Sequence, residues 1–224
     1  MIVNQTKAGW DIIFQRAHAL LAGKIAMQWK VSERPEPWPD VLSAIVDHDD
    51  GQRDWQTRAH LTDAGAPLDF TYQKLDFAQA KRTVRNARYR SRRIALLTSM
   101  HTSALYEPLR GTDPELDQFL DEQQDYQQKL RRNLSIRKDE AEKIYRLVFF
   151  CDACSLVLCK NEVPGNGNRL ELAPLPDQQT AYIFQRDDQQ LSVEPWPFED
   201  STFTVEADVF RLRQLSFKDD QELH

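Results

Sequence analysis

Residues 138–159 read KDEAEKIYRLVFFCDACSLVLC, a far more apolar helical pattern than the stretch before it. In a helix, residues three, four and seven apart share one face, and on that basis Val148, Phe149 and Leu156 flank Asp152. A carboxylate taken out of water costs several kcal/mol unless a cation compensates its charge. The pattern therefore predicts a central helix whose buried Asp152 needs a cationic partner, and a divalent metal would serve.

Polar side chains of the same kind interrupt the apolar stripes of three further predicted helices. His18 lies on the predicted helix 9–29, His48 and Asp49 lie in the last turn of the predicted helix 41–50, and His101 lies on the predicted helix 74–106. Taken singly, each residue has a plainer interpretation: a hydrogen-bonded core histidine, a contact with a helix end for Asp49, or an arginine partner for Asp152. Taken together, they favour one shared site.

Helix and strand signals divide the chain into a helical part and a smaller β part. A proline-rich loop at 34–39 separates the first two helices, and a mostly solvated helix runs from Asp113-Pro114 to about residue 133. After residue 160 the pattern changes to strands at 170–175, 181–184, 191–193 and 202–215. We expect a mainly α fold with a small C-terminal antiparallel β element, organised as a helical domain over 1–160 and a β-rich appendage over 161–224 packed on it.

Composition narrows the classes of function. The net charge of −6 argues against a nucleic-acid binder, and no run approaches the roughly 20 apolar residues that a membrane span needs. Met1 to Trp10 lacks the pattern of a signal peptide, and the three cysteines (Cys151, Cys154 and Cys159) suit free thiols in a reducing compartment. We expect a cytoplasmic protein that acts on a small anionic substrate and can form a homo-oligomer.

The ordered set His18, His48-Asp49 and Asp152 resembles the HD-domain superfamily of metal-dependent phosphohydrolases. The resemblance implies an HD-like helical bundle in which these residues gather one or two divalent cations. His101 resembles the additional histidines of two-metal members. A bare His-Asp dipeptide is a weak motif, so the specificity of the resemblance comes from the whole set.

A closer resemblance is to a smaller bacterial family of unassigned function that is related to the HD domains. It rests on four runs: His18-Ala19-Leu20-Leu21-Ala22-Gly23, His48-Asp49-Asp50-Gly51-Gln52-Arg53-Asp54-Trp55, Gly65-Ala66-Pro67-Leu68-Asp69-Phe70 and Pro195-Trp196-Pro197-Phe198. Shorter runs around His101 and Asp152 also fit, so the resemblance covers nearly the whole chain. One departure is Gln52, where the pattern has tryptophan.

The ligand types define the chemistry of the expected site. Imidazole and carboxylate ligands suit iron, manganese, zinc or nickel, and such a metal can activate a water for attack on a phosphorus or carbonyl centre. Asp50 and Asp54 are candidate catalytic residues, as a general base or as orienting groups. Arg92, Arg93 and Trp55 are candidate substrate-binding residues, although the basic run 81–93 is also typical of a solvated helix face.

Three functions remain open at this point. The favoured one is a metal-dependent phosphohydrolase that uses a metal-activated water. The second is an HD-type diiron oxygenase, which the same ligand set would support. The third is a non-catalytic binding or interaction protein in which the polar cluster is structural.

Overall fold

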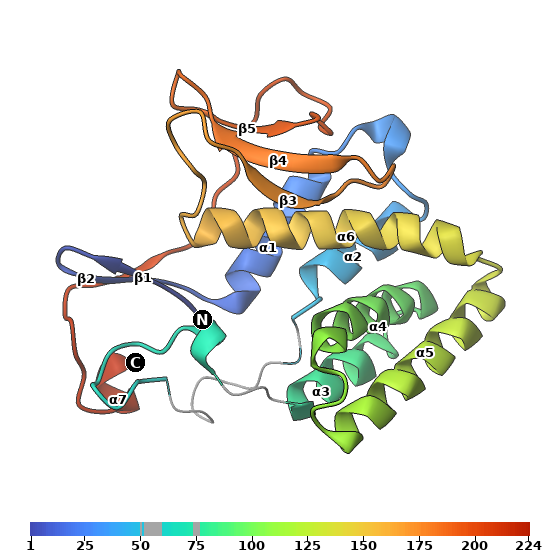
Figure 1. Cartoon of the computed structure of the whole chain (residues 1–224), viewed down its shortest axis with the longest axis horizontal. Helices are drawn as coiled ribbons and strands as arrows, with labels where there is room; N and C mark the ends of the chain where they lie inside the picture. Colours follow the sequence, from blue (N-terminus) through green and yellow to red (C-terminus); the bar gives the residue numbers. More distant parts are fainter. Residues whose placement is uncertain (50, 52–59, 74–76) are drawn as a thin grey trace.

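The computed structural model describes residues 1–49, 51, 60–73 and 77–224. Four helices form its centre: α1 (Gln15–Met27), α2 (Trp38–Val46), α4 (Arg92–Tyr106) and α6 (Lys138–Cys159). Helix α6 packs against each of the other three, and α2 also contacts both α1 and α4. The sequence 138–159 therefore does form the central helix that its apolar pattern predicts (Figure 1).

Helices α3 (Phe77–Ala87) and α5 (Pro114–Leu134) flank α4, and a short α7 (Asp220–Leu223) lies near the C-terminus. In the part of the chain that the structure describes, three 3₁₀ turns join the larger elements: η1 (Val31–Glu33), η3 (Phe70–Tyr72) and η4 (Glu107–Leu109). None of the helices in the described ranges is long and apolar enough to cross a membrane.

The main core lies between α1, α6 and the aromatic residues of the segment 196–203. Trp29 is fully buried, and its ring meets Phe150 of α6 edge-on with 5.4 Å between the ring centroids. The Phe198 ring lies 6.0 Å from that of Trp29 and 6.4 Å from that of Phe150, so the three rings pack against one another. Aromatic side chains bury the largest apolar areas, so this group joins α6 to the C-terminal part of the chain.

Two antiparallel three-stranded sheets accompany the helices. The first has the order β1 (Ile2–Thr6), β2 (Gly9–Ile13) and β6 (Phe210–Leu212). The second has the order β3 (Leu170–Pro174), β4 (Thr180–Gln185) and β5 (Leu191–Glu194), and β3 packs on α6 (Figure 1). The fold is thus mixed and mostly helical.

The N-terminal sheet corrects the prediction that β structure lies only at the C-terminus. Gly9 to Ile13 form strand β2, so the first helix begins at Gln15 and not at Gly9. A Cβ at Gly9 would lie 2.1 Å from the carbonyl oxygen of Leu212, which explains why glycine occupies this position next to β6. The strand pairing joins the two ends of the chain, and the domain boundary at residue 160 remains a prediction.

Other predicted boundaries also need correction. The predicted helix 74–106 is two helices, because Ser91 begins α4 by accepting a hydrogen bond from the Ile94 amide at 3.1 Å. Of the predicted strand 202–215, residues 210–212 alone form a strand. Helix α2 ends at Val46, so His48 and Asp49 lie in the turn after it and not in its last turn.

Candidate metal centre

His48 is held in place by the backbone of its own segment. Its Nδ1 lies 2.6 Å from the carbonyl oxygen of Ile45, one turn back along α2. A carbonyl oxygen can only accept, so Nδ1 carries the proton and donates it to Ile45. Nε2 of the neutral ring is then an unprotonated ligand atom that faces the interior.

Two carboxylates approach this Nε2 atom from different elements. Asp152 Oδ1, on α6, lies 3.1 Å from it, although the two atoms are not aligned for a hydrogen bond. Asp49 Oδ2 lies 3.8 Å from it. Nε2 of His48 therefore faces two carboxylates, that of Asp152 on α6 and that of the adjacent residue Asp49.

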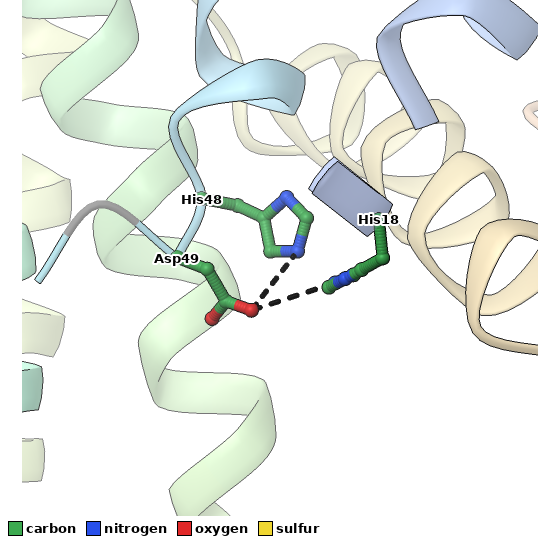
Figure 2. A group of neighbouring side chains, drawn as sticks. All are labelled: His18, His48 and Asp49. Carbon is green, nitrogen blue, oxygen red and sulfur yellow. Dashed lines mark ion pairs between the residues drawn. The ribbon is translucent and has the colours of Figure 1, made fainter. Parts of the chain in front are cut away.

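His18 brings a second imidazole to the same point from α1. Its Nε2 lies 3.4 Å from Asp49 Oδ2 and 3.6 Å from Asp152 Oδ1. Figure 2 shows the Asp49 carboxylate facing both the His18 and the His48 rings. Both carboxylates are thus shared between the two imidazoles.

His101 completes the group from α4. Its Nε2 lies 3.8 Å from Asp152 Oδ2, and its ring centroid lies 4.9 Å from that of His48. On the far side of the ring, the Tyr145 hydroxyl lies 3.5 Å from Nδ1. A partner at Nδ1 leaves Nε2 directed at the carboxylates, as in metal sites where a second residue orients the ligand histidine.

Several polar atoms of this cluster are buried without a hydrogen-bond partner. They are His18 Nδ1 and Nε2, His48 Nε2, His101 Nε2 and Asp152 Oδ1. Buried polar atoms are nearly always paired, so a group of unpaired atoms at one point indicates that these side chains bind something there, such as a metal ion. In the described part of the chain, the unpaired imidazole nitrogens of His18, His48 and His101 thus lie together beside the carboxylates of Asp49 and Asp152.

The spacing of the cluster fits a metal ion. Two ligand atoms that each lie about 2.0–2.2 Å from one cation are about 2.8–3.6 Å apart at octahedral or tetrahedral angles. Of the five separations between imidazole nitrogens and carboxylate oxygens, three lie within this range, from 3.1 to 3.6 Å, and two are slightly longer at 3.8 Å. Two sets of ligand atoms lie within 4.8 Å of one another: His18, His48 and Asp49; and His48, His101 and Asp152. The cluster could therefore hold a metal ion.

Residues 1–214 match the model of a family described as "Protein of unknown function (DUF3891)". The chain belongs to this family. No curated protein matches it, and no solved structure does. The expected membership of a family of unassigned function is thus confirmed, whereas the family match shows no link to the HD domains.

Burial and charge set unusual pKa values in the cluster of this DUF3891 protein. Burial lowers the pKa of His18 and of His101 to about 4. Burial acts in the same direction on His48, but the charges of Asp152 and Asp49 outweigh it and raise the pKa of His48 to about 9. In return, the charge of His48 overcomes the effect of burial on Asp152 and lowers its pKa to about 2. In the metal-free protein at neutral pH, a protonated His48 therefore balances Asp152.

The five predicted metal ligands of the DUF3891 protein thus meet at one point, and all but Asp49 are buried. Their role as ligands remains a prediction. Asp50, Asp54 and Trp55 lie outside the described residues.

The two predicted substrate-binding arginines begin α4. Arg92 and Arg93 precede His101 by nine and eight residues, which corresponds to about 12–14 Å along a helix axis. Neighbouring basic residues have partners of a structural kind: Arg90 pairs with Asp47, and Lys81 pairs with Glu115. These contacts favour the interpretation of the basic run as an ion-paired surface. Nη1 of Arg93, by contrast, is buried without a hydrogen-bond partner, and the role of Arg92 and Arg93 in binding is still a prediction.

Sequence reasoning missed Tyr145. It precedes Asp152 by seven residues on α6, so the two share one helix face. The spacing of seven residues could therefore have identified Tyr145 as a neighbour of the predicted histidines. The Ile45 carbonyl has no such signal, because a backbone acceptor is not visible in a sequence.

Proposed function

We propose that this DUF3891 protein is a metal-dependent hydrolase whose substrate is a phosphoester. The observation that carries the proposal is the convergence of three imidazoles and two carboxylates, with unpaired ligand atoms, at one buried point. Further support comes from the order His18, His48-Asp49 and Asp152 along a helical bundle, which resembles the HD-domain phosphohydrolases.

The residues of the cluster suit a hard or borderline divalent cation. Nitrogen and oxygen ligands favour iron, manganese, zinc or nickel, and no described thiol belongs to either set of ligand atoms. When bound, such a cation supplies a hydroxide nucleophile near neutral pH and neutralises charge on an anionic substrate. In the proposed reaction, His18, His48, His101, Asp49 and Asp152 hold the cation and fix its position in the bundle.

Two features of the surrounding chain would maintain the site between turnovers. The Ile45 carbonyl keeps the proton of His48 on Nδ1, so that Nε2 remains available as a ligand. Tyr145 occupies the corresponding position at His101. Both contacts would restrict ring rotation, and a fixed ligand geometry preserves an open position for substrate.

The test begins with the metal content of protein purified without an affinity tag, measured by plasma mass spectrometry. We expect at least one equivalent of a transition metal in the wild type and a loss of that metal in His48→Ala. His60→Ala is the matched control, because His60 is a buried histidine outside the cluster. Absence of metal from the wild type after reconstitution with iron, manganese, zinc and nickel would favour the non-catalytic alternative and refute the proposal.

The chemistry is tested on the metal-loaded protein. We expect hydrolysis of p-nitrophenyl phosphate or bis(p-nitrophenyl) phosphate that His48→Ala abolishes and His60→Ala retains. The two overlapping ligand sets that share His48 favour one competing function, an HD-type diiron oxygenase. Oxygen consumption by the iron-loaded protein, without ester hydrolysis, would select that function instead.

A further inference from the structure

A cavity lies beside α1 and α6, the two helices that carry His18 and Asp152. It has a volume of about 890 Å³. Leu21 and Ile25 of α1 and Cys154 and Leu158 of α6 line it, whereas none of the five cluster residues does. A volume of this size is typical of small-molecule sites, which range over about 300–1,000 Å³.

One wall of the cavity is a strap, which we define as residues 201–209. The strap is not part of either sheet, and in the described structure no backbone–backbone hydrogen bond ties it to another segment. Burial alternates along it: Phe203, Val205 and Ala207 are half-buried, while the residues between them are exposed. These three line the cavity, together with the exposed Ser201, Thr202, Thr204 and Val209. This period of two is that of an extended strand with one apolar face.

The opposite wall includes β5, at the free edge of the second sheet. Leu191, Ser192 and Val193 are consecutive and all line the cavity. Successive side chains of a strand point to opposite faces, so contact with all three places the cavity against the strand edge. Two extended segments with unpaired edges therefore flank the space, and the strap does not close the gap by pairing with β5.

The lining is amphipathic. Its interior contains Ile25, Leu158, Ile183, Val193, Trp196 and Phe198. Arg186, Gln190 and Asn161 line the cavity around the turn between β4 and β5 and the end of α6. Further polar residues of the lining lie on β1, β2, β5 and the strap: Asn4, Asp11, Ser192, Ser201, Thr202 and Thr204. Arg186 is exposed and pairs with Asp188 at 3.0 Å, so its charge lies at the solvent boundary. A partly open space of this size, with apolar side chains beside polar ones, is suited to a ligand that has both kinds of surface.

We propose that this cavity binds a single-chain amphiphile, with its hydrocarbon portion against α1, α6 and the strap and its polar head at Arg186 and Gln190. An apolar chain would cover the buried lining, and the head would remain hydrated beside the β4–β5 turn.

The test is a calorimetric titration of the full-length protein with sodium dodecanoate, repeated with decan-1-ol. We expect saturable binding of about one equivalent of dodecanoate. In Ala207→Trp, a large ring would fill the cavity, and the affinity should fall at least about tenfold. Glu206→Trp is the matched control, because the Glu206 side chain on the same strap is 88% exposed, and it should bind as the wild type does.

Unchanged helicity and metal content of Ala207→Trp would show that its loss of dodecanoate affinity is local. If Ala207→Trp does not fold, Val205→Phe serves as a second variant that fills the cavity. Three results would overturn the proposal: no saturable binding of either probe, equal binding by the wild type and the filling variants, or a wild-type dimer that Ala207→Trp dissociates. The last result would assign the cavity to a second copy of the chain. Since the cavity and the cluster share no lining residue, failure here leaves the proposed hydrolase untouched.

Discussion

Nε2 of His48 lies 3.1 Å from Oδ1 of Asp152, without the alignment of a hydrogen bond. His48 follows α2, and Asp152 lies in the middle of α6. A close approach of two buried polar atoms that do not bond one another is the geometry that two ligands of a common ion adopt. The predictions about Asp152 and about pH derive from this relationship.

Replacement of Asp152 by asparagine should remove the metal. The amide keeps the size of the side chain but loses the charge, and metal affinity should fall by more than the 10–100-fold typical of residues that only orient ligands. Asp139→Asn, an exposed site on the same helix, is the control and should keep wild-type affinity. Affinity is measured by competition with a chelating dye, and stoichiometric metal in Asp152→Asn would contradict the assignment.

Metal affinity should rise with pH. Below a pKa of about 9, His48 carries a proton that a metal must displace, so affinity should increase about tenfold per pH unit between pH 5 and 8 and level off above 9. Below about pH 4, protonation of His18 and His101 should steepen the dependence. Calorimetry at pH 7 in buffers of different ionisation enthalpy should detect about one released proton. An affinity that is flat from pH 6 to 8 would show that His48 is not a ligand.

Replacement of Tyr145 by phenylalanine should weaken metal binding without unfolding the protein. The ring and its packing against Phe149, with centroids 6.0 Å apart, are kept, while the hydroxyl beside His101 is lost. At 3.5 Å the contact is long, so we expect a loss of about tenfold, the low end for an orienting partner. Tyr126→Phe is the comparison, and an equal loss in both variants would deny Tyr145 a specific role.

The close packing of α1 on α2 should be sensitive to Gly23. A Cβ at this position would lie 2.5 Å from Cγ2 of Val46. Alanine gains about 1 kcal/mol of helix propensity over glycine, but overpacking costs about 1–3 kcal/mol, so Gly23→Ala should lower the unfolding free energy and move His18 away from His48. Thermal melts and metal titrations measure both effects.

A second substitution tests the cause. In the double variant Gly23→Ala with Val46→Ala, the clash is gone, and the stability loss should be smaller than the sum of the two single losses. Strict additivity would mean that the contact between Gly23 and Val46 does not limit the approach of the helices.

Metal binding should stabilise the folded chain. An ion that binds the native state alone adds about 4 kcal/mol when its concentration is a thousand times its dissociation constant. A chelator should therefore lower the melting temperature of the wild type by several degrees and leave that of His48→Ala unchanged. A shift of the same size in His48→Ala would indicate binding elsewhere.

Local patterns in the sequence predict most helices and the meeting of the ligands. Apolar residues at helical spacing around Asp152 identify α6, with the bounds found in the structure. The same periodicity places His18 and His101 on inward faces, and a bundle brings such faces together. The convergence could thus be expected from the sequence, although the distances could not.

Long-range pairing explains what the sequence did not predict. Gly9 to Ile13 form a strand because β1 and β6 pair with them, and β6 lies near the opposite end of the chain. A local pattern carries no information about such a partner. Conversely, Ser91 is of a residue type that favours helix N-termini, and this local signal predicts the start of a new helix within 74–106.

The order of the ligands along the polypeptide has a consequence for biosynthesis. During translation, His18, His48 and His101 all leave the ribosome before Asp152 does, and each of the two ligand sets draws on His48. A nascent chain that lacks α6 can offer imidazoles but not the carboxylate that faces all three of them. The set His18, His48 and Asp49 is complete without α6, whereas the set His48, His101 and Asp152 can hold an ion only after α6 has docked.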